Sequence, residues 1–236
     1  MPLLRIVPAI ETTPYDVLLA ADPVVVVTDV IRATTTGTTA LARGNRCIAK
    51  PTVEAAREAA AALDGSVLLA GEQGGDLIDG FDLNNSPAAV DRIEGKIIIL
   101  VSSSGTRVLH GASRARDVYV SCLRNVSATV RAVAEAGRDA VLLAACTRGE
   151  FRDEDRLLAG WMARDLGDRG FAPADDLTRD VLRDWAHAGP EDVLESESVA
   201  FLRRAGHEDD LDFILGRIDD LAFPVKLVEG EFVRDA

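Results

Sequence analysis

The chain has 236 residues, of which 47% are hydrophobic and 28% are charged, a composition typical of a globular protein with a substantial core. Its 26 basic and 39 acidic residues give a formal net charge of −13, which argues against general binding to nucleic acid or to an anionic membrane. An anionic small molecule stays compatible with this charge, provided that the pocket supplies its own arginine or metal. We therefore expect neither a nucleic acid nor a membrane as a partner.

The N-terminal segment and the cysteines suggest a cellular compartment. No basic segment followed by a long apolar one begins the chain, and no apolar run approaches the roughly 18 residues of a membrane span. Cys47, Cys122 and Cys146 lie far apart and form no C-x-x-C motif, so we expect neither a disulfide framework nor a zinc site. The three histidines lack metal-ligand spacing such as H-x-x-x-H. These features favour a cytoplasmic protein.

Short apolar runs alternate with helix-like stretches through the first two thirds of the chain. The runs at 24–28, 67–70, 97–101, 118–120 and 140–145 are rich in β-branched residues and predict strands. The stretches at 35–43, 53–63, 106–112 and 126–136 predict helices, and Thr52 is the expected N-cap of the second. This alternation predicts an α/β fold with a largely parallel or mixed sheet and helices on both faces.

The last third of the chain has mainly helical periodicity. Helices are predicted at 154–166, 175–188, 191–205 and 208–217, and a final strand at 224–228. No low-complexity linker interrupts the chain, so we predict one α/β domain over 1–236 with a helix-rich elaboration at about 153–217. The exposed faces of these helices could form the interface of a homodimer.

Three segments share one form: an apolar strand, then a polar turn with an arginine near it, then a helix. They are residues 24–44, 97–113 and 140–160. Ligands of open α/β sheets bind beyond the carboxyl ends of the strands, so three such turns in one sheet are expected to meet at one crevice.

The first two of these turns carry groups that attract an anion. Asp29, Arg32, Thr34 and Thr35 follow the first strand, and a run of Ser, Gly and Thr at 102–106 follows the second, just before Arg107. Unpaired backbone N–H groups at a helix start bind anions, and hydroxyls add donors. Ordinary helix capping by Thr and Ser accounts for the same residues, and neither turn matches a nucleotide-binding motif.

The segment GEQGGDLIDGFDLNNSP at 71–87 interleaves carboxylates with glycines. Glu72 and Asp82 are hard oxygen ligands of the kind that Mg²⁺ prefers, and glycine lets a backbone approach a ligand closely. A flexible acidic surface loop is the alternative, because Gly, Asp and Asn clusters mostly form turns.

The segment CTRGEFRDEDRLLAG at 146–160 places a cysteine at a strand end and acids at a helix start. Glu154 and Asp155 cannot lie on one face of the helix, so at least one is expected to point toward the strand ends. Acids in a first turn also simply complement the helix dipole. Cys146 could act as a thiolate nucleophile if Arg148 lowered its pKa, although such a cysteine is more often a small buried hydrophobe.

Together and in this order, the motifs resemble those of the 2-phosphosulfolactate phosphatase family over nearly the whole chain. They are DVIRATTT (29–36), GEQGG (71–75), GFDLNNSP (80–87), SSGTRVL (103–109), SCLRN (121–125) and CTRGEFRDEDRLLAG (146–160). The resemblance implies an α/β fold particular to that family, distinct from the haloacid-dehalogenase type. It also implies a Mg²⁺-dependent phosphatase that hydrolyses 2-phosphosulfolactate to 3-sulfolactate and phosphate, a step toward coenzyme M.

The resemblance further implies a site in which carboxylates hold Mg²⁺ and arginines hold the anionic groups of a small phosphorylated substrate. The expected catalytic residues are Asp29, Arg32, Glu72, Asp82, Arg107, Cys146, Glu154 and Asp155. The expected metal ligands among them are Asp29, Glu72, Asp82 and Asp155. The expected substrate-binding residues are Thr34, Thr35, Asn85, Ser86, Ser103, Ser104, Gly105, Thr106 and Asn125. Attack by water is favoured over a Cys146 phosphoenzyme, because Cys146 lies at the end of an apolar strand.

Several positions depart from the family pattern. Gln73 replaces a common Arg, Asn84 a Gly, and Ser104 an Asn, and the segment at 196–199 stands where the family often carries Ser-x-His-Gly. These departures leave two alternatives open: a phosphatase for another small phosphorylated hydroxyacid, and a catalytically weakened anion-binding protein.

Overall fold

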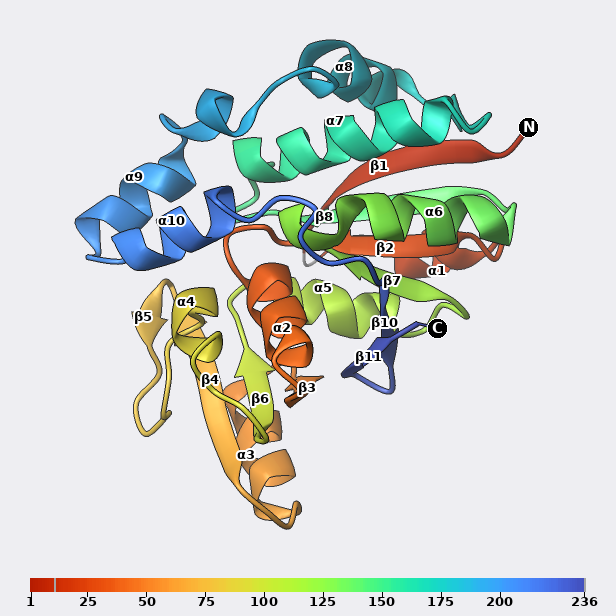
Figure 1. Ribbon diagram of the computed structural model, residues 1–236. Helices are drawn as coiled ribbons and strands as arrows, with labels where there is room; N and C mark the ends of the chain where they lie inside the picture. The colour runs from red at the N-terminus through yellow and green to blue at the C-terminus, as the bar shows by residue number, and fades with distance from the viewer. Residues whose placement is uncertain (11, 236) are drawn as a thin grey trace.

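Within residues 1–10 and 12–235, which the computed structural model describes, one 11-stranded sheet runs through the molecule (Figure 1). Its order is β5-β4-β6-β3-β11-β10-β7-β2-β8-β1-β9. The strands are β1 (Leu3–Ala9), β2 (Val24–Thr28), β3 (Arg46–Ala49), β4 (Val67–Gln73), β5 (Asp76–Leu77), β6 (Ile97–Val101), β7 (Val118–Ser121), β8 (Ala140–Ala145), β9 (Ala172–Pro173), β10 (Val225–Val228) and β11 (Glu231–Arg234).

Helices cover both faces of this sheet. They are α1 (Tyr15–Leu19), α2 (Ala33–Ala42), α3 (Val53–Ala61), α4 (Pro87–Val90), α5 (Gly105–Ala112), α6 (Val126–Ala136), α7 (Asp153–Gly167), α8 (Asp176–Trp185), α9 (Glu197–Arg204) and α10 (Glu208–Leu215), with 3-10 turns at Leu123–Asn125 and Pro190–Val193. The predicted α/β class with a mixed sheet flanked by helices is confirmed.

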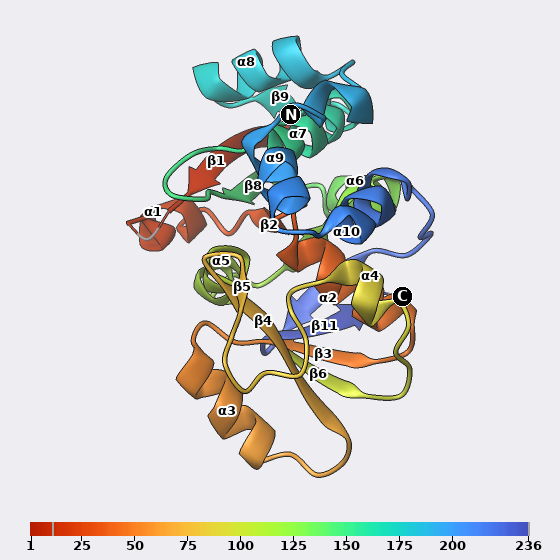
Figure 2. The same cartoon turned by 90° about the vertical axis from the view of Figure 1, so that its left-hand side faces the viewer.

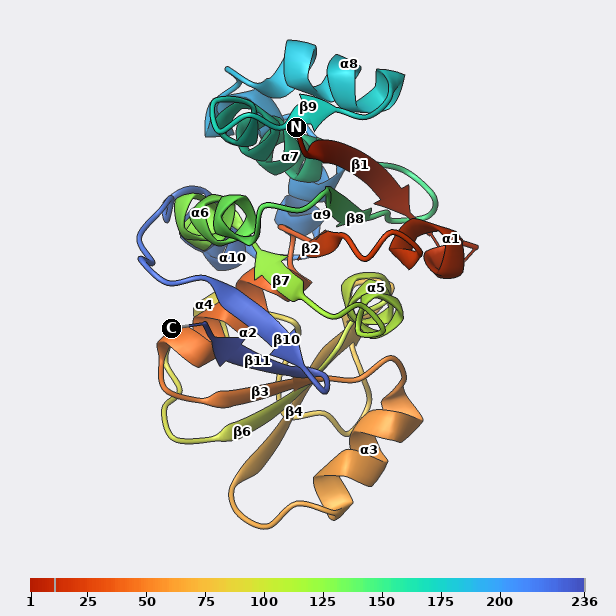
Figure 3. The same cartoon turned by 90° about the vertical axis from the view of Figure 1, so that its right-hand side faces the viewer.

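The sheet consists of two parallel parts joined by a hairpin. One part contains β4, β6 and β3, and the other contains β7, β2, β8, β1 and β9. The β10–β11 hairpin pairs antiparallel with β3 on one side and β7 on the other, so it links the two parts (Figure 3). In Figure 1, β1 and β2 run across the view while β4 and β6 rise toward them. The carboxyl ends of strands from both parts therefore meet in one region.

The four valines of β2 are buried on both faces of the sheet. Val24 and Val26 pack in one hydrophobic cluster with α6 and α7, whereas Val25 and Val27 pack in another with α2 and α5. Figure 3 shows α5 and α6 on opposite sides of β7 and β2. Complete burial of a central parallel strand explains why its sequence shows no alternation of apolar and polar residues.

The structure confirms the five strands predicted in the first two thirds and the final strand, and Thr52 caps α3 by accepting from the Ala55 N–H at 3.1 Å. Three strands of at least four residues escaped the prediction: β1, β3 and β11. Arg5 and Pro8 interrupt the apolar pattern of β1, which is held by parallel pairing with β8. The helix predicted at 191–205 is divided, because α9 begins only after its N-cap Ser196.

The C-terminal helices complete the region where the strand ends meet. A small hydrophobic cluster of Val199, Leu202 and Leu211 packs α9 and α10 together and against Ile31 after β2. Figure 2 shows α9 and α10 in front of the turn between β2 and α2, and α10 also contacts α4. In the part of the chain that the structure describes, no helix has the length and apolar character needed to cross a membrane.

Candidate functional site

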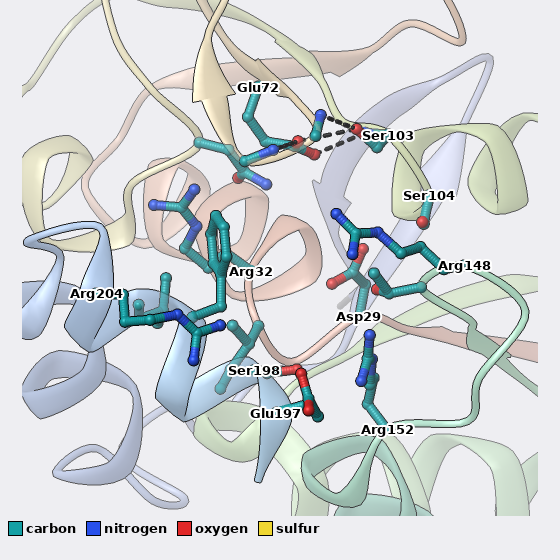
Figure 4. A pocket seen from close by; sticks show the side chains of 17 residues that line it. Asp29, Arg32, Glu72, Ser103, Ser104, Arg148, Arg152, Glu197, Ser198 and Arg204 are labelled. Carbon is teal, nitrogen blue, oxygen red and sulfur yellow. Dashed lines mark hydrogen bonds between the residues drawn. The ribbon is translucent and has the colours of Figure 1, made fainter.

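A cavity of about 280 Å³ lies where the loops after β2, β4, β6 and β8 meet α9 (Figure 4). The three similar turns of the sequence do converge here, because residues from each of them line this cavity. The polar and charged residues of the lining are Asp29, Arg32, Glu72, Asn85, Ser103, Ser104, Thr147, Arg148, Arg152, Glu197, Ser198 and Arg204.

Asp29 is a buried carboxyl group directly after β2, and it is 8% exposed. Burial and the neighbouring charges of Glu72 and Glu154 raise its pKa from 3.8 to about 7, although the backbone N–H groups of Ala33 and Gly105 oppose this shift. A Cβ atom at Gly105 would lie 2.2 Å from Asp29 Oδ2. Glycine is therefore required at the start of α5 to let its backbone approach the carboxylate.

Glu72 is oriented by hydrogen bonds from two loops. Its Oε1 accepts from the Ser103 N–H at 2.7 Å, and its Oε2 accepts from the Ser103 hydroxyl at 2.9 Å and from the Gly75 N–H at 2.7 Å. The dashed lines in Figure 4 mark bonds in this group. The loop after β6 and the turn after β4 thus hold this carboxylate at the cavity.

Two further carboxyl groups lie buried behind Asp29. Asp155 Oδ1 accepts from the Thr28 hydroxyl at 3.1 Å and from the Val30 N–H at 2.9 Å, which ties α7 to the end of β2. Burial and the charges of Glu154 and Asp29 raise the pKa of Asp155. Burial also raises the pKa of Glu154, whose Oε2 has no hydrogen-bond partner among the described residues. Both acids thus face inward, whereas the sequence required this of only one.

Arg32 lines the cavity from a buried position that α10 holds in place. Its Nη1 donates to Asp210 Oδ2 at 2.8 Å and its Nη2 donates to Asn84 Oδ1 at 3.0 Å. Asp210 also accepts from the Ser86 hydroxyl at 2.5 Å and from the Ala88 N–H at 3.1 Å. One carboxylate therefore joins Arg32 to the start of α4.

Arginine side chains gather around the cavity although the whole chain carries −13. Four arginines and three carboxylates line it, and two of the arginines pair with Asp210 and Glu150, which lie outside the lining. Arg152 Nη1 lies 2.9 Å from Glu150 Oε2. Arg148 and Arg204, by contrast, have no ion-pair or hydrogen-bond partner within residues 1–10 and 12–235. Figure 4 shows them on opposite sides of the cavity, with Arg148 on the side of Asp29 and Ser104.

Several predicted anion-binding side chains instead stabilise the local backbone. The Thr34 hydroxyl bonds with the Asp29 backbone, the Thr35 hydroxyl donates to Val30 O, and the Thr106 hydroxyl donates to Ser102 O. Ser86 is the N-cap of α4. Asn125 is fully buried between β7 and α6, where its side chain bonds Cys122 N and Val120 O. Local bonding to the backbone, with helix capping at Ser86, explains these residues, and the cavity lining includes none of them.

Asp82, Arg107 and Cys146 lie outside this cavity lining. The exposed Asp82 accepts from the Leu69 N–H through Oδ2 at 2.8 Å. Arg107 and Cys146 line an adjoining cavity of about 690 Å³, which shares Ser103, Ser104 and Arg148 with the first. Burial and Asp155 raise the pKa of Cys146 to about 11, so its thiol is protonated at neutral pH.

Six residues that build or support the site were not among the predicted site residues. They are Arg148, Arg152, Glu197, Ser198, Arg204 and Asp210. Arg148 and Arg152 lie within the motif at 146–160, so their place in it could have indicated them. Glu197, Ser198 and Arg204 are on a short amphipathic helix whose place beside β2 depends on tertiary packing.

The carboxylate oxygens at the cavity suit a hard cation, but only one that takes some of its ligands from outside the protein. Among the residues that the structure describes, no group of three or more His, Cys, Asp or Glu side chains is arranged to hold a metal ion. Mg²⁺ often binds through one or two carboxylates and takes its other ligands from water and substrate. Asp29 and Glu72, which repel each other at the cavity, fit that mode of binding.

Comparison of the sequence with known proteins identifies its family. The model of the 2-phosphosulpholactate phosphatase family matches residues 11–224. The probable 2-phosphosulfolactate phosphatase of Clostridium perfringens strain SM101 is 31% identical over 229 residues, which cover 89% of this chain and 93% of that protein. The protein of the same description from Thermus thermophilus is 34% identical over 88% of this chain and 89% of its own length. That from Caldanaerobacter subterraneus subsp. tengcongensis is 39% identical over 66% of each chain. The chain therefore belongs to the 2-phosphosulpholactate phosphatase family, a family of phosphatases.

Proposed function

We propose that this chain hydrolyses 2-phosphosulfolactate to 3-sulfolactate and phosphate with the help of Mg²⁺. One observation carries the proposal: Asp29 and Glu72 line the same small cavity as four arginines. The substrate carries phosphate, carboxylate and sulfonate on three carbons, so its site needs concentrated positive charge. The family membership of the chain and the names of its relatives support the choice of substrate.

Asp29 and Glu72 are the residues that would hold Mg²⁺. When bound, the cation supplies charge that neutralises phosphoryl oxygens. The hydrogen bonds of Ser103 and Gly75 to Glu72 keep that carboxylate in place before substrate arrives. Such fixed geometry favours phosphoryl transfer, which depends mainly on positioning and on charge stabilisation.

The arginines bind and orient the substrate. Guanidinium groups match phosphate, sulfonate and carboxylate oxygens in pairs, and Arg148 and Arg204 have their donors available. Ile31, Phe201 and Leu202 add an apolar side to the cavity. In the reaction, water oxygen bonds to phosphorus, the bond from phosphorus to the C2 oxygen breaks, and that oxygen takes a proton to become the hydroxyl of 3-sulfolactate.

A phosphate-release assay tests the proposal. Purified protein with Mg²⁺ is expected to release phosphate from 2-phosphosulfolactate faster than from 2-phospholactate, which lacks the sulfonate, and little without Mg²⁺. Release from 2-phospholactate alone would instead identify a phosphatase for another phosphorylated hydroxyacid. Binding without any release would identify an anion-binding protein, and a preference for neutral sugar phosphates would contradict the proposal.

A further inference from the structure

Arg148 occupies a tight turn whose backbone conformation disfavours its side chain. The Thr147 N–H donates to Glu150 O at 3.1 Å and the Glu150 N–H donates to Thr147 O at 3.0 Å, so Arg148 and Gly149 form the two-residue tip. Their φ angles are 54° and 80°. A hairpin turn with positive φ at both central residues favours Asn-Gly, Asp-Gly or Gly-Gly, because other side chains are strained there. An arginine at the first position therefore lowers the stability of the turn.

This strained residue is also the arginine that both cavities share. Arg148 lines the cavity of Asp29 and Glu72 as well as the adjoining one, together with Ser103 and Ser104. Figure 4 shows its side chain directed into the first cavity beside Asp29 and Ser104. Arg148 is exposed, and within residues 1–10 and 12–235 its guanidinium group has no hydrogen-bond or ion-pair partner, so its donors are available to a ligand in the cavity.

Two other arginines that line the site are already engaged. Arg32 donates through both Nη atoms to Asp210 and Asn84. Arg152 forms an ion pair with Glu150. A substrate oxyanion that approaches Asp29 thus meets the unengaged guanidinium of Arg148 on that side of the cavity.

We propose that Arg148 binds an oxyanion of the substrate, and that the strained turn serves to direct this guanidinium group into the cavity. Strained backbone often occurs at functional sites, and the positive φ of Arg148 is such an outlier beside a cavity. The inference rests on the proposed function for the source of the oxyanion, which is either the phosphoryl or the sulfonate group.

The chain contains a matched control turn. Glu229 and Gly230 join β10 to β11 between the paired residues Val228 and Glu231, with φ angles of 51° and 84°. Glu229 is exposed and lines neither cavity. The two turns thus share their geometry and their glycine, and differ in whether the strained side chain enters the site.

The test compares Arg148→Asn, Arg148→Lys and Glu229→Asn with the unchanged protein. Thermal unfolding is measured for each, and isothermal titration calorimetry with Mg²⁺ present measures the binding of inorganic phosphate and, separately, of methanesulfonate. Relief of a left-handed residue is expected to raise the melting temperature by about 2–4 °C in both Asn variants. Only Arg148→Asn is expected to weaken binding of at least one anion, by about tenfold. Arg148→Lys keeps the charge but loses the planar fork, so an intermediate loss is expected.

Weaker phosphate binding would assign Arg148 to the phosphoryl group, and weaker methanesulfonate binding would assign it to the sulfonate. Unchanged binding of both anions in Arg148→Asn would overturn the inference. A melting temperature that rises in Glu229→Asn but falls in Arg148→Asn would overturn its claim of strain. Because the titrations need no turnover, they decide the role of Arg148 even if the unchanged protein releases no phosphate and the proposed function fails.

Discussion

Arg32 and Asp210 form a buried ion pair, with side-chain exposures of 4% and 2% and an Nη1 to Oδ2 distance of 2.8 Å. The partners are 178 residues apart in the chain. Because Asp210 also accepts from Ser86 and Ala88, it connects α10 with the start of α4 and with the turn after β2. This pair therefore holds the C-terminal helices against the site that the N-terminal half builds.

Asp210→Asn is expected to lower the free energy of unfolding by about 3 kcal/mol, because it leaves the buried charge of Arg32 without its counterion. Activity is expected to fall as well, since Arg32 lines the cavity. Urea unfolding and phosphate release measure the two effects. The neighbouring Asp209→Asn is the control: its side chain is 85% exposed and lies 3.8 Å from Arg92, so a change below about 0.5 kcal/mol is expected. Equal effects of the two changes would show that the buried pair has no special role.

Glu72→Gln is expected to reduce phosphate release about tenfold or more and to raise the Mg²⁺ concentration needed for half-maximal activity, because a neutral amide is a weaker ligand for Mg²⁺. Asp82→Asn removes a carboxylate from the same loop, but one that lies outside the cavity lining. Its activity and Mg²⁺ requirement are therefore expected to stay within about twofold of the unchanged protein. Mg²⁺ titrations of the activity of both variants show which of the two carboxylates sets the Mg²⁺ requirement. If Asp82→Asn impairs activity as strongly as Glu72→Gln does, the original expectation that Asp82 is a metal ligand gains support.

Cys146→Ser is expected to retain most of the activity. Burial and Asp155 raise the pKa of this thiol to about 11, so almost no thiolate is present near neutral pH. The loss of a true nucleophile lowers turnover by several orders of magnitude. Steady-state phosphate release from the variant distinguishes the two cases, and trapping of a phosphorylated protein would contradict attack by water.

The stability of the metal-free protein is expected to fall as the pH rises from 5 to 7.5. The folded state raises the pKa of Asp29 from 3.8 to about 7 and also raises those of Asp155 and Glu154, so it binds protons that the unfolded chain has already lost. The free energy of unfolding then decreases through this window, by on the order of 1 kcal/mol for each unit of pKa shift. Urea unfolding in EDTA at several pH values measures the slope.

Asp155→Asn is the matched variant for that slope. Its amide oxygen can still accept from Thr28 and Val30, while one of the repelling charges is removed. The pH dependence is expected to become shallower, and the variant to be at least as stable as the unchanged protein at pH 7.5. A slope as steep as before would mean that groups outside this cluster cause it.

Much of the fold could be read from local patterns. Short stretches of sequence predict three strands and one helix cap: the valines of β2, the apolar runs of β6 and β8, and the Thr52 cap of α3. This is possible because burial of a parallel strand and helix capping depend on short stretches of chain. By contrast, β1 is interrupted by Arg5 and Pro8, and it is a strand because β8 lies beside it. The prediction of one domain with a helix-rich elaboration, and that of a possible homodimer, stay predictions.

The sequence by itself determined which loops bear charge. Asp29, Glu72 and Ser103 could be named from strand-end motifs, since polar residues after buried parallel strands meet at one edge of the sheet. Tertiary structure alone decided that Asp82 lies outside the cavity lining and that the Thr34 and Thr106 hydroxyls form hydrogen bonds with the backbone. It also decided that Arg204 and Asp210, on helices far along the chain, lie at the site. The physical reason is the sequence separation of the interacting residues. Helix capping and strand burial depend on near neighbours in the chain. The direction of a loop carboxylate and the position of a C-terminal helix depend on contacts between residues far apart in the chain.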